Sequence, residues 1–222
     1  LDSACGTNYG LYKSPGFAAS AYFTAYFETE IGCWGFHDSG SGVSDTNCLS
    51  WFAKESGDPS INRLRRNSID QKVKKVNVYD LMWYDPNNIS DTVELNLDAY
   101  YSEVGAVTMR SSWQKGATFT GLHGGANSAS HGDLDVGNFF IDGAGKRFIM
   151  ELGSDNYNIP SYFGNLRWTY YRKRAEGQNT LVIGKVSYKL PDQLPKAIAK
   201  FTRVENNEAS SIAVVDMGVA YD

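Results

Sequence analysis

The densest group of titratable side chains lies in the segment SHGDLDVGNFFID, residues 130–142. His131, Asp133 and Asp135 alternate within it, so an extended backbone would point all three side chains to one face. A histidine with carboxylates on one face can transfer protons or hold a metal ion. A polar turn rich in Gly, Asp and Asn explains the same residues without any chemistry, and both interpretations stay open.

A basic and aromatic strip runs from Lys146 to Arg174. It contains six Lys and Arg residues but only two acidic residues, although the net charge of the whole chain is -4. Tyrosine and tryptophan are interleaved with these cations, at positions 157, 162, 168, 170 and 171. A strip of this kind suits an anionic ligand, and aromatic faces suit sugar rings. The alternative is a set of strands whose cations are solvated on their outer face.

The first part of the chain is expected to be helical. Ser14-Pro15 is typical of an N-cap followed by the first helical position. A helix is predicted from the apolar spacing over residues 17–31, a second over residues 47–54 or a little further, and a third in the basic stretch over residues 62–76. The segment LMWYDP is expected to end the third of them at Pro86, and residues 37–45, HDSGSGVSD, are predicted to be a loop.

Strands and turns replace this pattern from about residue 100 onward. Short strands are predicted over residues 105–113, 117–122, 137–142, 147–152, 180–183, 197–204 and 211–215. Turn-like segments separate them at residues 123–130, 142–146 and 152–158. A few helices followed by many short strands predict a mainly β protein of the α+β type, in which a short helical region joins an antiparallel β-sandwich.

Composition limits the classes of function. Hydrophobic residues make up 42% of the chain and aromatic residues 14%, which is enough apolar surface for an ordered domain. The net charge of -4 argues against general nucleic-acid binding, which relies on a basic face. No apolar run of about 18 residues is present, so no transmembrane segment is expected.

Residues 123–157 resemble the catalytic β-sandwich segment of the heparinase II/III-like polysaccharide lyases. In that family a segment H-x-H-x-D-x-G-x-F is followed by a strand ending in D-x-G, then by YYR, then by an H-N-T strand. The counterparts in this sequence are HGDLDVGNF (131–139), ELG (151–153), YYR (170–172) and QNTLVIG (178–184). Because several elements match in the same order, the resemblance is more specific than any single motif.

The resemblance implies two domains. Residues 1–96 would be the last helices of an incomplete α/α toroid, and residues 97–222 would form the β-sandwich, cut short at its C-terminus. The toroid's own catalytic Tyr and Asn or His would lie upstream of this chain. Family members are often exported, which favours a periplasmic or secreted location, although the chain shows no export signal.

The activity that the resemblance implies is β-elimination in a uronate-containing, anionic polysaccharide. His131 matches the family's active-site histidine and is expected to transfer protons, with Tyr162 as a second catalytic candidate. The candidates for substrate binding are Arg172, Arg167 and His37, whereas His123 is expected to be structural or exposed. A carbohydrate-binding relative that keeps the fold without catalysis is the alternative function.

The sequence departs from the family at the three positions that usually hold a zinc ion. Asp133, Glu151 and Gln178 stand where the family has His, Asp and His. A set of oxygen ligands prefers Ca²⁺ or Mg²⁺ to Zn²⁺, so one such cation is the first expectation. A metal-free network, in which Gln178 donates hydrogen bonds to both carboxylates, and a retained zinc ion are the alternatives.

Overall fold

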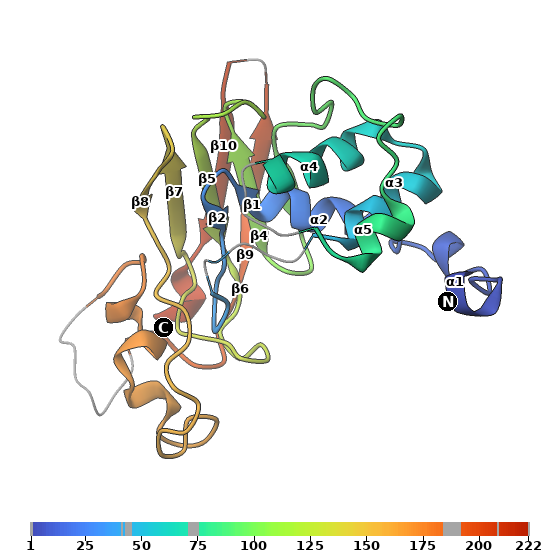
Figure 1. The fold of residues 1–222 in the computed structure, drawn as a ribbon. Coiled ribbons are helices and arrows are strands. Elements are labelled where there is room, and N and C mark those ends of the chain that lie inside the picture. Colours follow the sequence, from blue (N-terminus) through green and yellow to red (C-terminus); the bar gives the residue numbers. More distant parts are fainter. Residues whose placement is uncertain are drawn as a thin grey trace. The chain divides into compact units, whose positions relative to one another are not determined.

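The computed structural model describes residues 2–40, 42, 46–70, 76–183, 192–207 and 209–221. The chain divides into two compact units. One unit comprises residues 1–28 and 43–96, and the other comprises residues 29–42 and 97–222 (Figure 1). Residues 29–42, which include His37, therefore belong to the same unit as residues 131–135, the HGDLD segment.

The first unit is helical. It contains α1 (Asp2–Cys5), the 3-10 helix η1 (Leu11–Lys13), α2 (Ser20–Phe27), α3 (Cys48–Ser56), α4 (Pro59–Asp70) and α5 (Val78–Trp83). A small apolar core of Ala21, Leu49, Phe52, Ala53 and Ile61 joins α2, α3 and α4. No helix in the described part of the chain is long and apolar enough to cross a membrane.

Helix α2 is shorter than the pattern over residues 17–31 indicated, and its predicted start at Ser14-Pro15 is wrong. Its N-cap is Ala19, and residues 15–19 form turns. Gly16 explains the late start, because its φ of 78° lies in the left-handed region and cannot continue a right-handed helix.

The basic stretch over residues 62–76 forms α4 as far as Asp70, and residues 71–75 lie outside the described part. The prediction that residues 81–86 end this same helix is wrong, because a new helix, α5, begins at Val78. Its N-cap is Asn77, whose side chain accepts hydrogen bonds from Tyr79 N–H and Asp80 N–H. The Asp80 carboxylate in turn accepts from Asn77 N–H, which completes a capping box.

Strands dominate the second unit. A two-stranded sheet of β1 (Glu28–Thr29) and β2 (Gly32–Cys33) lies where the chain enters it. A five-stranded sheet has the order β3-β4-β5-β7-β8, with bounds Ala99–Tyr101, Ala106–Arg110, Phe119–His123, Phe139–Gly143 and Lys146–Ile149. A three-stranded sheet has the order β10-β9-β6, with bounds Ser211–Asp216, Ile198–Asn206 and Gly125–Ala126 (Figure 1). The strands within these two larger sheets pair antiparallel.

The two larger sheets pack against each other. The rings of Tyr100 on β3 and Phe201 on β9 lie 5.5 Å apart, edge to face. At Gly124, which links β5 to β6, an added Cβ would meet the side chains of Val215 and Phe201. The predicted fold class, a short helical region followed by antiparallel sheets, is confirmed by this arrangement.

The strand predicted over residues 180–183 is wrong. These residues follow three 3-10 helices, η2 (Arg167–Thr169), η3 (Tyr171–Lys173) and η4 (Ala175–Gly177), and form no ladder; Gly184 lies outside the described residues. Single contacts hold the chain here instead: the Thr180 hydroxyl donates to Val136 C=O at 2.5 Å, and Asn179 donates to Met150 C=O at 2.8 Å. A last 3-10 helix, η5 (Gly218–Ala220), follows β10.

The segment after β2 packs on the five-stranded sheet through Trp34. This side chain is buried, and its ring occupies the space above Gly121 of β5, where any Cβ would lie only 2.4 Å from it. Phe36 stacks on His123 at the end of β5, with 4.3 Å between ring centroids. This packing places the next two residues, His37 and Asp38, beside the HGDLD segment.

Candidate active site

The HGDLD segment is a loop and not a strand. Asn127 and Gln193 hold it: Asp135 N–H donates to Asn127 Oδ1 at 3.1 Å, and Val136 N–H donates to Gln193 Oε1 at 3.1 Å. His131 has a φ of 61°, in the left-handed region. The prediction that His131, Asp133 and Asp135 share one face is therefore wrong, because an extended backbone is interrupted at its first residue.

His131 is the accessible member of the loop. Its side chain is 48% exposed, and its Nδ1 lies 3.1 Å from Asp38 Oδ2 and 3.2 Å from the Tyr157 hydroxyl. An ionised carboxylate accepts the Nδ1–H proton and leaves the lone pair of Nε2 toward solvent. The ring is thereby oriented as a proton-transfer group.

Asp38 is held by three donors. The Tyr162 hydroxyl donates to Oδ1 at 2.5 Å, Lys173 Nζ donates to the same oxygen at 2.6 Å, and Arg167 lies 3.3 Å from Oδ2. Burial alone would raise the pKa of this carboxyl, but the Lys173 and Tyr162 hydrogen bonds lower the pKa of Asp38 to about 2. Asp38 is therefore ionised near neutral pH.

Tyr157, and not Tyr162, is the exposed tyrosine at this site. Tyr162 is 2% exposed, and its hydroxyl is used by Asp38. The Tyr157 ring is 46% exposed and lies beside His131 and Phe163, with centroids 5.8 and 5.0 Å away. Burial and the Asp38 carboxylate raise the pKa of Tyr157, so its phenol stays protonated near neutral pH.

The basic strip divides into buried and exposed cations. Lys173 is fully buried between Asp38 and Asp133, and Arg167 donates to Gly132 C=O and lies 3.1 Å from Asp133. Arg172 keeps 41% of its side chain exposed, although it donates to Leu152 C=O and pairs with Asp155. Of the two predicted substrate-binding arginines, Arg172 is thus the one with exposed surface.

The three predicted metal-binding residues lie in one buried network. Gln178 Nε2 donates to Asp133 Oδ2 at 3.2 Å. Asn138 Nδ2 donates to Gln178 Oε1 at 3.1 Å and also to Glu151. Burial raises the pKa of Glu151 to about 7, with the charge of Asp135 acting in the same direction.

These contacts do not fit a zinc ion at this position. The Asp133 carboxylate is bound by Lys173 Nζ at 2.8 Å and by Arg167 at 3.1 Å, and the Gln178 oxygen already accepts from Asn138. None of the three side chains offers the imidazole or thiolate that Zn²⁺ usually takes. A bound Ca²⁺ or Mg²⁺ at these residues stays a prediction.

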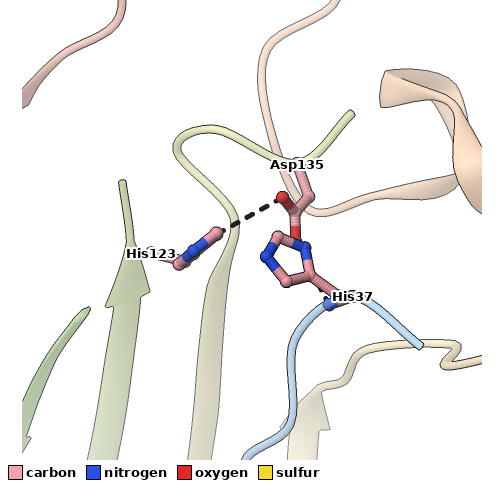
Figure 2. Close-up of side chains that lie close together, drawn as sticks. All are labelled: His37, His123 and Asp135. Carbon is pink, nitrogen blue, oxygen red and sulfur yellow. Dashed lines mark hydrogen bonds and ion pairs between the residues drawn. The ribbon is translucent and has the colours of Figure 1, made fainter. Parts of the chain in front are cut away.

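His37 lies in a second, buried cluster with His123 and Asp135. Figure 2 shows His123 at the end of β5, His37 in the segment after β2 and Asp135 in the HGDLD loop, with both rings beside the carboxylate. His37 Nδ1 lies 3.1 Å from Asp135 Oδ2, and His123 Nδ1 lies 3.3 Å from Oδ1. Burial would raise the pKa of Asp135, but the two imidazoles hold it below its usual range. His37 is 8% exposed, so little of its surface is open to a polysaccharide.

Sequence reasoning missed three residues at the His131 site: Asp38, Tyr157 and Lys173. Asp38 follows His37 in a Gly- and Ser-rich loop, and its type and neighbours resemble any polar turn. Tyr157 and Lys173 were visible only as members of the basic and aromatic strip. The sequence signal that could have identified Tyr157 is its position at the end of residues 123–157, the segment that resembles the lyase β-sandwich.

Solved heparinase structures are similar to this fold. A crystal structure of heparinase III matches over 92% of this chain with a TM-score of 0.62 and 18% sequence identity. A mutant of the heparan sulfate lyase HepC from Pedobacter heparinus matches over 86% with a TM-score of 0.54 and 16% identity. Another heparinase III matches over 87% with a TM-score of 0.54 and 14% identity.

These matches cover only part of the heparinases. The chain spans 30% of the first heparinase III and 26% of each of the other two chains. A scan with protein-family models and a comparison with curated protein sequences found no match. At such low identity the likeness establishes the fold and leaves the chemistry to the residues of this chain.

Proposed function

We propose that this chain is the C-terminal portion of a polysaccharide lyase that cleaves a uronate-containing, anionic polysaccharide by β-elimination. The observation that carries the proposal is the half-exposed His131, whose Nδ1 is held by Asp38 in a fold similar to that of heparinase III. The adjacent Tyr157 hydroxyl supplies a second proton-transfer group.

β-Elimination removes the C5 proton, which lies α to the uronate carboxylate, and breaks the bond between C4 and the glycosidic oxygen. His131 Nε2 takes the C5 proton, and the electron pair of the C5–H bond forms the C4–C5 double bond. The electron pair of the C4–O bond leaves with the glycosidic oxygen. The Tyr157 phenol donates its proton to the departing oxygen. The imidazolium then loses the Nε2 proton to solvent and the phenolate takes a proton from water, which returns both groups to their starting forms.

The surroundings of His131 suit a sugar ring. Tyr157 and Phe163 expose 46% and 58% of their surface, and both rings contact the His131 imidazole. Their faces can pack on the apolar side of a pyranose. The exposed guanidinium of Arg172 is our candidate for the uronate carboxylate or a neighbouring sulfate, whereas Arg167, Lys173 and Tyr162 are positioning residues that hold Asp38.

The test is the chemistry of the products. The complete protein is incubated with heparan sulfate, alginate and other uronate polysaccharides, and the products are analysed by mass spectrometry. A lyase gives oligosaccharides with an unsaturated terminal uronate, each lighter by one water than the hydrolysis product. Hydrolysis-type masses would contradict the proposal, and retention of an oligosaccharide without cleavage would favour the non-catalytic carbohydrate-binding alternative.

A further inference from the structure

We propose that His37, His123 and Asp135 bind one Zn²⁺ ion, at a site distinct from the Asp133, Glu151 and Gln178 network. The ligand atoms of these three side chains all lie within 4.8 Å of one another. All three residues are buried, with exposures of 8%, 0% and 0%. Metal binding here can be measured without any assay of the proposed lyase activity.

The unsatisfied nitrogens of His123 are the strongest single observation. Among the described residues, neither ring nitrogen of His123 nor Oδ1 of Asp135 has a hydrogen-bond partner, although Nδ1 and Oδ1 lie 3.3 Å apart. Buried polar atoms without partners destabilise the folded state. His123 Nδ1 and Asp135 Oδ1 are close to each other but are not aligned for a hydrogen bond. This spacing is that of two neighbouring ligands on one ion, since the ligand atoms of a tetrahedral Zn²⁺ lie roughly 3.3–3.6 Å apart.

The surroundings of His123 fix which nitrogen faces the site. Nε2 lies against the backbone of Gly125, where an added Cβ would be 2.8 Å away, so Nδ1 is the atom that faces Asp135. Phe36 stacks on the ring at 4.3 Å and 15°. The His123 backbone is held by Asn138 C=O and Gly137 N–H, each at 2.8 Å. The imidazole is therefore preorganised for a ligand that approaches from the Asp135 side.

His37 Nδ1 faces the same carboxylate. It lies 3.1 Å from Asp135 Oδ2 and 3.2 Å from the backbone nitrogen of Asp133. A neutral imidazole nitrogen has one lone pair, so Nδ1 can accept from Asp133 N–H or bind an ion beside Asp135, but it cannot do both. In the ion-bound state this lone pair would point to the ion that Asp135 and His123 share.

The donor types select the ion. Two imidazoles and one carboxylate suit Zn²⁺ better than Ca²⁺ or Mg²⁺, which prefer oxygen ligands. Outer contacts also support Asp135: its Oδ2 accepts from His37 N–H at 3.3 Å, and its own N–H donates to Asn127. Such support is typical of metal ligands. One position on a tetrahedral ion would remain for a water molecule.

An ion at this site would hold the backbone that carries Asp38. His37 has a φ of 62°, in the left-handed region that few non-glycine residues adopt. Fixing His37 to β5 and to the HGDLD loop also fixes the next residue, Asp38, which contacts His131. The proposed ion would therefore have a structural role next to the candidate active site.

The experiment measures zinc binding by the purified 222-residue chain, prepared without a histidine tag and stripped with chelator. We expect one Zn²⁺ per chain by elemental analysis after dialysis, and a rise in melting temperature of about 5–10 °C when free zinc is roughly 100-fold above Kd. His123→Phe keeps the stacking on Phe36 and removes the ligand. It should lose the zinc and the melting shift while melting, without metal, at or above the wild-type temperature.

Matched variants separate the possible locations. His131→Gln removes the exposed histidine and Glu151→Gln alters the other network, and both should still bind one zinc. If His123→Phe does not fold, Asp135→Asn serves as the second ligand variant and should also lose the ion. Zinc that persists in these ligand variants, zinc lost only in Glu151→Gln, or a wild-type chain that binds no zinc would each overturn the proposal.

Discussion

The carboxylate of Asp38 lies 3.1 Å from Nδ1 of His131, although 93 positions separate the two residues along the chain. The preceding residue, His37, contacts Asp135 instead. A single short segment after β2 therefore connects the exposed imidazole to the buried cluster. The candidate site depends on this segment as much as on the HGDLD loop.

Asp38→Asn should lower kcat by about 10²–10⁴-fold while the protein stays folded. The amide no longer demands a proton on Nδ1, so the imidazole loses the tautomer that leaves Nε2 as a base. Steady-state kinetics of the complete protein on its polysaccharide check this, with circular dichroism as the control for folding. Wild-type turnover in a folded Asp38→Asn protein would show that this carboxylate does not orient His131.

Tyr157→Phe should lower kcat by about 10²-fold with a small change in KM, because it removes a proton donor and keeps the ring. Tyr162→Phe is the matched variant: it removes a buried hydroxyl from Asp38 and should cost about 1–3 kcal/mol of stability. Its kcat should fall less. Urea denaturation and kinetics on both proteins test the assignment, and the reverse order of the two kcat values would return the catalytic role to Tyr162.

Arg172→Lys should raise KM by roughly 5–30-fold, because a lysine cannot reproduce the paired hydrogen bonds of a guanidinium to a carboxylate or sulfate. Arg203→Lys is the control, since Arg203 is an exposed arginine paired with Glu205 on β9, far along the chain from the strip. Equal effects of the two substitutions would indicate that Arg172 is merely a solvated cation.

Asp80→Asn should destabilise the helical unit by about 3–5 kcal/mol, because it removes the carboxylate from the buried Arg65 guanidinium, 2.5 Å away. Burial would raise the pKa of Asp80, but Arg65 and the Asn77 N–H lower it. A lowered folded-state pKa stabilises the protein above the unfolded value of about 4, and this stability is lost as pH falls.

Urea denaturation between neutral and acidic pH measures both effects. The wild-type free energy of unfolding should fall below about pH 4, and that of Asp80→Asn should fall less steeply. Asp70→Asn, at the exposed pair with Arg66 on α4, should change little at any pH. Equal stabilities of Asp80→Asn and Asp70→Asn would contradict a stabilising role for the buried pair.

Local patterns were enough to predict much of the fold. Six of the seven predicted strands overlap β4, β5, β7, β8, β9 and β10, since alternation and turn residues act within a few positions. Strands β3 and β6 are only three and two residues long, too short for such a pattern. The start of α2 failed because the backbone of one residue, Gly16, outweighed a favourable capping sequence.

The candidate site was predictable only in part. His131 followed from the resemblance of its segment to a lyase motif, but its partner Asp38 and the buried His37–Asp135 contact depend on chain segments more than ninety residues apart. Tyr157 and Tyr162 have the same residue type, and only burial, 46% against 2% exposed, separates their roles. Burial likewise separates Arg172 from Arg167 within one basic strip.

The central claim is that His131 transfers the proton in a β-elimination. The most direct measurement is the rate at which the complete protein produces ultraviolet absorbance from the conjugated C4–C5 double bond of an unsaturated uronate, compared between wild type and His131→Gln. We predict a steady increase for the wild type and a rate about 10²–10⁴-fold lower for the variant, which should stay folded because the His131 side chain is 48% exposed. Equal rates for the two proteins, or cleavage of the polysaccharide without this absorbance, would contradict the claim.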